Sequence, residues 1–262
     1  MQKRAMAAQI MATVNQKGGQ SKTVTTYHVG EAARVEKKRL LLVDDDKQGS
    51  LSLLHPRVAG AAPGLLSKHL YETELPSNLQ PEVLDDTTAI IRADGEWDGA
   101  TPENRKNFAD NLRKLVEVHG YELVLIDTPG ALNERVAAAL IAATVVICPV
   151  SVGLLEMAGL AKLWGYINAI KTKGLNTKLR VMGMLPSKVN PKSPEEAEGL
   201  DFLRNQYGNA ILPHVLYERA SVKQSIARRK PVWIGTKGAG HLTAAREWKV
   251  ACNFILKNLG VI

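Results

Sequence analysis

The chain alternates short runs of aliphatic residues with longer amphipathic segments, and this alternation is typical of a sheet assembled from βαβ units. The aliphatic runs are apolar at successive positions, as expected for parallel strands that helices cover on both faces. We expect strands over residues 10–14, 39–44, 123–127, 145–149 and 179–185. We expect helices over residues 23–36, 102–119, 134–143, 156–173, 194–207, 220–228 and 242–259.

Residues 55–100 are the least regular part of the chain, because Pro, Gly and Asp interrupt any periodic pattern there. We interpret them as a surface excursion between the second strand and the next helix, not as a separate domain. The sequence therefore predicts one α/β domain over residues 1–262, with a doubly wound, mostly parallel sheet. About ten residues precede the first strand, so we expect no DNA-reading helix-turn-helix domain in front of it.

A glycine-rich loop, Asn15 to Thr23, follows the first strand and opens the first helix. This is the position of a phosphate loop, whose backbone N–H groups and helix N-terminus bind phosphate oxygens. Lys22 would reach the β- and γ-phosphates, and the Thr23 hydroxyl would ligate Mg²⁺. The loop predicts a P-loop NTPase-like fold with a nucleotide held by Gly18, Gly19, Gln20, Ser21, Lys22, Thr23 and Val24.

Two aliphatic strands end in carboxylates. Asp127 ends the run 123–127, and Asp44 ends the run 39–44 and is followed by Asp45 and Asp46. Because the carboxyl ends of parallel strands share one edge of a sheet, these acids are expected beside the phosphate loop, where Mg²⁺ of a nucleotide would lie. A solvated acidic turn is the simpler explanation of the three adjacent acids, and the phosphate loop makes it less favoured.

Composition and charge limit the class of protein further. The 262 residues are 45% hydrophobic, which is enough for a sizeable core, and the net charge of +8 (34 basic minus 26 acidic residues) favours a polyanionic partner. Charge alone leaves nucleic acid and an anionic membrane equally open. The longest apolar run, 136–150, is too short to span a membrane, and no signal peptide is evident. Cys148 and Cys252 match neither a disulfide framework nor a metal site, and we expect both to be buried.

These motifs together resemble the ParA/MinD family of deviant Walker-type ATPases, specifically the short partition ATPases. The resemblance covers most of the chain and rests on Lys17-Gly18-Gly19 with Lys22-Thr23, on Asp44-x-Asp46-x-Gln48-Gly49 and on residues 126–129; the stretch from Arg219 to Trp233 is a weaker match. It implies ATP and Mg²⁺ as cofactors. It also implies that Lys17 reaches the nucleotide of a second subunit, that Asp46 positions the attacking water and that Asp127 holds Mg²⁺ through water.

The resemblance further implies an ATP-dependent homodimer that binds DNA nonspecifically and is released when a centromere-binding, ParB-like partner stimulates hydrolysis. Such a protein is cytoplasmic and associated with the nucleoid. Basic residues cluster near the expected helix 220–228 and on the last helix, and no base-reading module is evident, so we expect duplex phosphates to be bound. The candidates are Lys223, Arg228, Arg229, Lys230, Arg246 and Lys249. The last helix is expected to pack on the sheet and not on a membrane.

Three positions depart from the family pattern. Ser21 stands where the family has glycine, Lys47 where it has proline after the second acid, and Gly130 where a second proline is common. The Ser21 side chain either crowds a phosphate or donates a hydrogen bond to it, and the sequence leaves both open. Alternative functions are therefore a non-catalytic DNA-binding or regulatory protein, or an ATPase that positions cargo or serves conjugation. A cluster-bearing reductase is disfavoured because the two cysteines lie apart in apolar runs.

Overall fold

The computed structural model describes residues 7–19, 21–57, 59–60 and 62–262, without the side chains of residues 154–158. Its central sheet contains the strands β1 (Gln9–Thr13), β2 (Leu40–Asp44), β3 (Glu82–Val83), β4 (Thr88–Ile91), β5 (Leu123–Asp127), β6 (Val145–Val150), β7 (Arg180–Val189) and β8 (Leu216–Tyr217). Within the described residues their order is β3-β4-β2-β5-β1-β6-β7-β8. Neighbours pair in parallel except β3 and β4, which are antiparallel.

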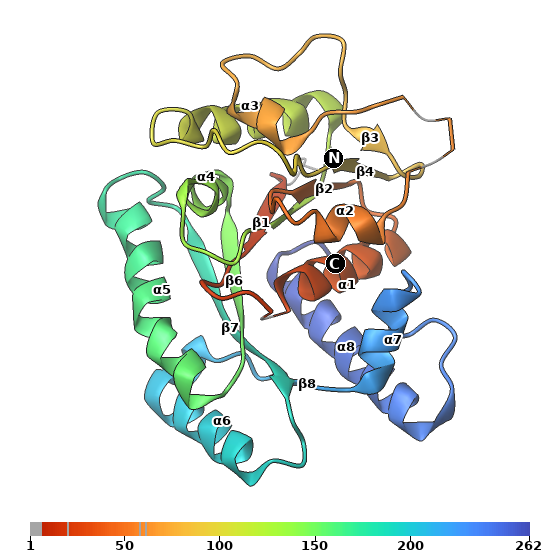
Figure 1. Cartoon of the computed structure of the whole chain (residues 1–262), viewed down its shortest axis with the longest axis vertical. Helices are drawn as coiled ribbons and strands as arrows, with labels where there is room; N and C mark the ends of the chain where they lie inside the picture. Colours follow the sequence, from red (N-terminus) through yellow and green to blue (C-terminus); the bar gives the residue numbers. More distant parts are fainter. Residues whose placement is uncertain (1–6, 20, 58, 61) are drawn as a thin grey trace, which may run out of the picture.

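Helices cover both faces of this sheet, as Figure 1 shows. They are α1 (Lys22–Val35), α2 (Ser50–Leu54), α3 (Arg105–His119), α4 (Glu134–Ala142), α5 (Leu154–Thr172), α6 (Pro194–Tyr207), α7 (Ala220–Ala227) and α8 (Gly238–Asn258), with short 3₁₀ turns η1 (Ser67–Tyr71) and η2 (Gly208–Ala210). The α/β class and the doubly wound, mostly parallel sheet are thus confirmed.

Two separate apolar cores hold the helices to the sheet. Phe108 of α3, Val136 of α4 and Leu163 of α5 belong to the core on one face. Tyr27 of α1 and Trp248 of α8 belong to the core on the other. Every residue of β2 and β5 is buried, as expected for parallel strands covered on both sides. The expectation that α8 packs on the sheet is confirmed, and no helix in the described part of the chain is long and apolar enough to cross a membrane.

The interpretation of residues 55–100 as a surface excursion is wrong for part of this segment. β4 lies inside the sheet, where Leu40 to Val43 of β2 pair with Thr88 to Ile91. All four residues of β4 are buried. The run is only four residues long, so its own pattern is too short to indicate a strand without its partner β2.

Two helix starts differ from the prediction by three residues or more. α3 begins at Arg105 and not at residue 102, because residues 102–104 form a turn in which Asn104 Oδ1 accepts from the Thr101 N–H. α8 begins at Gly238, four residues before the expected start at 242, although two glycines in its first turn disfavour a helix. Cys148 and Cys252 are both buried free thiols, as expected.

Candidate functional site: a phosphate loop between two acidic strand ends

The loop between β1 and α1 is fixed to the sheet at its start and to α1 at its end. The Asn15 side chain donates to the Pro149 carbonyl at the end of β6 (2.6 Å), and its Oδ1 accepts from the Lys17 N–H (3.1 Å). At the far end the Ser21 carbonyl accepts from the Thr25 N–H (2.8 Å) in the first turn of α1. The loop is therefore held at the carboxyl edge of the sheet, directly before a helix N-terminus.

Ser21 has a left-handed backbone (φ 64°, ψ 17°), as does Gly19 (φ 75°). A left-handed conformation is uncommon for a residue with a Cβ, and glycine adopts it freely. Ser21 therefore retains the loop shape that glycine would give, at a conformational cost. Gln20, which we expected to bind nucleotide, lies outside the described residues.

Gly130 allows the loop after β5 to approach the phosphate loop. A Cβ at this position would lie 2.9 Å from the Gly18 nitrogen and 3.0 Å from the Gly18 Cα. Both atoms are backbone, so neither can move without moving the loop. Gly130 is therefore required for the contact between the two loops, a role that the sequence did not reveal.

Thr23 and Asp127 meet beneath the loop. The Thr23 hydroxyl donates to Asp127 Oδ2 (2.6 Å), and Asp127 Oδ1 is buried with no hydrogen-bond partner among the described residues. Burial raises the pKa of Asp127 well above its usual range, and the nearby Asp44 charge raises it further. A cation at this site would satisfy the unpaired oxygen and stabilise the carboxylate.

This pair of side chains fits Mg²⁺, which prefers hard oxygen ligands and keeps several waters or phosphate oxygens. In the described part of the chain, no group of three or more His, Cys, Asp or Glu side chains could hold a metal ion alone. The residues present therefore fit a cation that arrives with a nucleotide, held by Thr23 directly or by Asp127 through water.

Lys22 begins α1 and is buried, and its Nζ donates to the Lys17 carbonyl (3.2 Å). Burial lowers the pKa of Lys22, while the charges of Asp127 and Asp46 act to raise it. The backbone of Lys17 is thus part of the lysine's hydrogen bonding. A phosphate would give this buried ammonium an anionic partner.

The acids at the carboxyl end of β2 have different environments. Asp44 is buried, and its Oδ2 accepts from the Ser52 N–H of α2 (2.7 Å), while burial raises its pKa to about 6. Asp46 is half-buried, and its Oδ1 accepts from the Gln48 N–H (3.1 Å). Asp46 is the acid of this group that reaches the nearby cavity.

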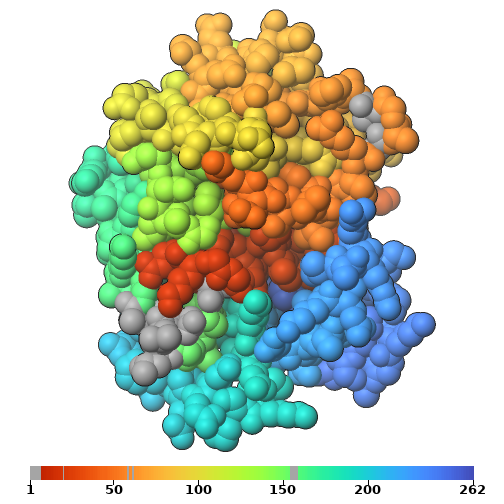
Figure 2. All heavy atoms as spheres, in the orientation of Figure 1, coloured from red at the N-terminus to blue at the C-terminus, as the bar shows by residue number. Residues whose placement is uncertain are grey.

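A cavity of about 500 Å³ lies over the phosphate loop. Most of the predicted nucleotide-binding residues line it, namely Gly18, Gly19, Ser21, Lys22, Thr23 and Val24, together with Asp46. In Figure 2 the start of the chain (red), residues after β2 (orange) and the α7–α8 region (blue) meet on one face. The sequence prediction missed Lys188 at the end of β7, Leu53 of α2 and Ile226 of α7, which also line the cavity. Among its described lining residues, Lys17 does not appear.

The predicted DNA-binding residues are exposed, in two groups. Arg228, Arg229 and Lys230 follow α7, and Arg246 and Lys249 lie on the solvent side of α8. Lys223 is also exposed, but its Nζ lies 2.6 Å from the Glu218 carboxylate. Its charge is therefore partly compensated.

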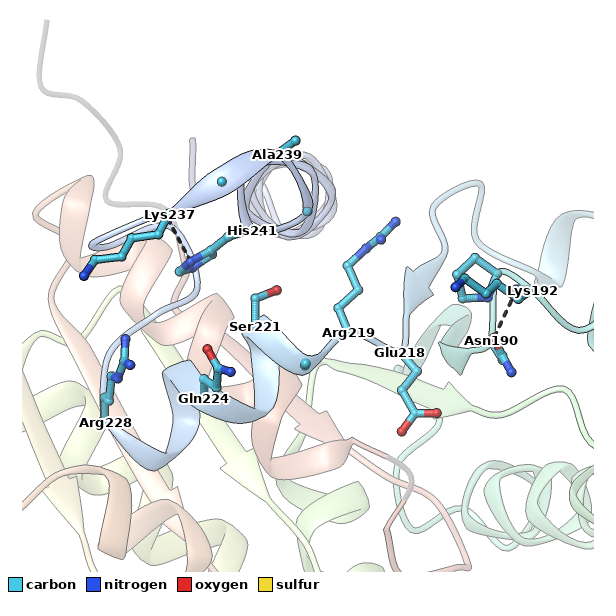
Figure 3. A pocket seen from close by; sticks show the side chains of 14 residues that line it. Asn190, Lys192, Glu218, Arg219, Ser221, Gln224, Arg228, Lys237, Ala239 and His241 are labelled. Atoms are coloured by element: carbon cyan, nitrogen blue, oxygen red, sulfur yellow. Dashed lines mark hydrogen bonds between the residues drawn. The ribbon is translucent and has the colours of Figure 1, made fainter.

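A second cavity, also about 500 Å³, lies beside the first of these groups. Figure 3 shows Arg228 and Lys237 at one end of it and Lys192 at the other. Lys237 is held there because its N–H donates to His241 Nδ1 (3.1 Å). Lys192 and Lys237 were not predicted, because they come from loops that only the fold brings near α7.

The parallel sheet, the phosphate loop and the acidic strand ends define a P-loop nucleotide-binding protein. A family model described as an AAA domain matches residues 8–181, more than half of the chain. Protein IncC of Escherichia coli is 26% identical over 96% of this chain and 70% of its own length. The chromosome partitioning protein ParA of Caulobacter vibrioides is 27% identical over 91% of this chain and 92% of its own. The chain belongs to this AAA domain family, as a ParA/MinD-type ATPase.

A solved structure with a similar fold is cobyrinic acid a,c-diamide synthase from Mycobacterium smegmatis, which holds ADP and magnesium. Its TM-score is 0.75 at 22% identity, covering 96% of this chain and 95% of that one. At this identity the likeness shows the fold alone.

Proposed function

We propose that this protein is a DNA-partition ATPase that binds DNA nonspecifically as an ATP-bound homodimer. The observation that carries the proposal is the arrangement of Lys22, Thr23 and Asp46 around one cavity, with the buried Asp127 in direct contact with Thr23. Relatives that align along nearly the whole chain, one of them named a chromosome partitioning protein, support the partition role over a synthase.

The proposed reaction is hydrolysis of ATP to ADP and phosphate. A water attacks the γ-phosphorus, the bond to the bridging oxygen breaks, and the bridging oxygen leaves with ADP. Mg²⁺ would neutralise charge on the phosphates, and the side chains that would hold it are those of Thr23 and Asp127. Lys22 stabilises phosphate charge from its buried position, and Asp46 orients the water.

A second copy of the chain completes the proposed site. Gly18 and Gly19 are exposed, so this face of the loop is open to another subunit. Lys17 lies beside them, and its side chain would reach the phosphates of that subunit. ATP bound between two subunits would favour the dimer, and hydrolysis would release it.

The DNA surface would be formed by the basic residues after α7 and on α8, with Lys192 and Lys237 added. Their contacts would be to phosphates and would read no sequence. A ParB-like partner that stimulates hydrolysis and an association with the nucleoid complete the proposal, and a relative named a chromosome partitioning protein supports the partition role that both would serve.

The test is binding to random-sequence duplex DNA at fixed salt with ATP and Mg²⁺, with ADP, and without nucleotide. We expect DNA binding only in the sample with ATP and Mg²⁺, together with a shift from monomer to dimer in that sample. Lys22→Ala should lose the ATP-dependent binding. Equal DNA binding under all three conditions would contradict the proposal that ATP controls DNA binding.

The non-catalytic alternative depends on Ser21, the loop residue that holds a glycine-like conformation. It is separated from the proposal by measuring phosphate release. Mg²⁺-dependent release that Lys22→Ala abolishes excludes the alternative. DNA binding without any release would favour it.

A further inference from the structure

Asp45 lies between Asp44 and Asp46 in the sequence, but its side chain points away from the nucleotide cavity. Its side chain is fully buried, and it is not among the described residues that line the cavity. Burial raises the pKa of Asp45, to about 7. The resemblance to known ATPases gives this residue no role, so its burial needs a separate explanation.

Arg135, in the first turn of α4, binds Asp45 through two groups at once. Its Nη1 donates to the Asp45 carboxylate (3.2 Å) and to the Asp45 main-chain carbonyl (3.1 Å). That carbonyl belongs to the peptide bond that joins Asp45 to Asp46. A guanidinium is a rigid, planar donor, so its position sets the orientation of this peptide.

Arg135 is itself fixed by Trp97. Its Nη2 donates to the Trp97 carbonyl (2.6 Å), and its guanidinium carbon lies 4.9 Å from the centre of the Trp97 ring. The Arg135 side chain is only 2% exposed. It therefore has little freedom to follow a displaced loop.

Tyr71 of η1 holds the other oxygen of Asp45. Its hydroxyl donates to Asp45 Oδ2 (2.8 Å), and its ring packs against Trp97 and Phe108, with centres 4.7 and 5.0 Å away. The Asp45 N–H donates to the Asp127 carbonyl (3.0 Å). Asp45 is thus held by η1, by α4 and by the second acidic strand.

We propose that Asp45 is a positioning residue for ATP hydrolysis, because Arg135 and Tyr71 hold it so that the next residue, Asp46, keeps its carboxylate at the nucleotide cavity. This inference rests on the proposed function. A buried ion pair loses much of its attraction to desolvation, so apolar residues of similar size would hold the fold as well. What they would not replace is the hydrogen bond to the peptide that carries Asp46.

The first test is Tyr71→Phe, which removes one hydroxyl and leaves the ring in place. We expect kcat for ATP hydrolysis to fall roughly tenfold, because small displacements of a catalytic group are costly, while the Kd for ATP stays within about twofold. The matched control is Tyr166→Phe, since the Tyr166 hydroxyl donates to the Asn133 carbonyl (2.9 Å) at the start of α4 and does not touch Asp45. The control should retain kcat.

The second test separates positioning from stability. The double variant Asp45→Leu/Arg135→Met removes both charges, so it should fold and keep its ATP affinity, but lose roughly 100-fold in kcat. Circular dichroism and thermal melting check the fold. In an Asp46→Ala background, Tyr71→Phe should leave the residual single-turnover rate, followed with γ-labelled ATP, unchanged.

Each result decides between the two proposals. If the unmodified protein hydrolyses ATP but Tyr71→Phe and the double variant keep its kcat, the positioning role is wrong and the proposed function stands. A further loss from Tyr71→Phe in the Asp46→Ala background also overturns the positioning role, because the effect then does not pass through Asp46. If the unmodified protein binds ATP without hydrolysing it, the hydrolysis in the proposed function fails, and the positioning role fails with it.

Discussion

Ser21 carries a side chain at a loop position whose backbone conformation favours glycine. Its left-handed backbone is the conformation for which glycine is usually required. The sequence identified this position as unusual but left the outcome open. The structure places Ser21 in the glycine-like conformation, so the departure from glycine costs conformational energy.

We expect Ser21→Gly to have a free energy of unfolding about 1 kcal/mol higher than Ser21→Ala, because alanine keeps the Cβ that disfavours this conformation. Urea denaturation of the two variants measures the difference. Equal stabilities would show that the Cβ is not strained at this position.

Gly130 gives a second prediction at the residue scale. Gly130→Ala would push against Gly18, and overpacking of this kind costs about 1–3 kcal/mol. Since the displaced atoms form the phosphate loop, ATP affinity should fall by roughly tenfold or more in a titration calorimeter. The control is Gly165→Ala in α5, where the added Cβ would meet no described atom within 4 Å beyond the neighbouring backbone of its own helix; it should bind ATP normally.

At the scale of elements, the sequence predicts those strands and helices whose own residues carry a clear pattern of buried and exposed positions. β2 and β5 are found because all five residues of each are buried and apolar up to a final Asp. The start of α6 is found because Ser193 and Pro194 are a typical helix start, and the Ser193 Oγ accepts from the Glu196 N–H (3.2 Å). β4 is missed because four residues carry too little pattern.

The residues of the site also fall into those that a local motif reveals and those that only the tertiary fold brings together. Lys22, Thr23 and Asp127 belong to local motifs, so their spacing reveals them. Lys188 and Leu53 reach the same cavity from the end of β7 and from α2, and only the tertiary fold brings them there. A signal for Lys188 did exist, because it is a basic residue at the carboxyl end of a strand.

The buried position of β4 predicts a clear stability difference. Ile90→Ala should lower the free energy of unfolding by about 2–5 kcal/mol, as expected for a large residue deleted from a core. Val83→Ala, in the neighbouring strand β3, alters a side chain that is 65% exposed and should have little effect. If Ile90→Ala were equally mild, residues 82–91 would not be part of the sheet.

His28 links α1 to the segment before α8. Its Nε2 accepts from the Val232 N–H (3.1 Å), its Nδ1 lies 2.8 Å from the Val24 carbonyl, and its ring stacks on Trp248. Burial lowers the pKa of His28 to about 4. The folded state therefore prefers neutral His28, whose contribution to stability is complete above about pH 6.5 and is lost as the pH falls toward 4.

We expect neutral His28 to contribute about 3 kcal/mol to the free energy of unfolding. Asp44 and Asp45 act in the opposite direction, because burial raises the pKa of each. The measurement is therefore the difference between the unmodified protein and His28→Gln. From pH 6.5 to 4, the variant should take up about one proton fewer on unfolding. An unchanged pH dependence would contradict the assignment.

For the whole molecule, the net charge of +8 matters through its placement. Arg228, Arg229 and Lys230 are exposed, and Arg228 lines one cavity with Lys237, whereas Lys223 is paired with Glu218. Arg228 and Lys237 therefore place two positive charges at one cavity near the end of α7. Binding through these residues would depend strongly on salt, because each phosphate contact releases a counterion.

We expect Arg228→Ala to weaken binding to any duplex sequence and to reduce the slope of log K against log salt by about 0.9. The control is Lys114→Ala, an exposed lysine on α3, which lies across the sheet from α7 and should leave the slope unchanged. Fluorescence anisotropy at several salt concentrations gives both slopes. A slope that falls equally in both variants would mean that charge acts only through its total.

The two apolar cores lie on opposite faces of the sheet, while the phosphate loop, both acidic ends and Lys188 lie along one rim. Sequence change along that rim need not disturb either core. The same scaffold can therefore acquire new chemistry by drift in a few loops, which agrees with its occurrence in a synthase at 22% identity. The capacity of this fold to evolve new activities follows from the position of its site residues, at the carboxyl edge of a parallel sheet and outside both cores.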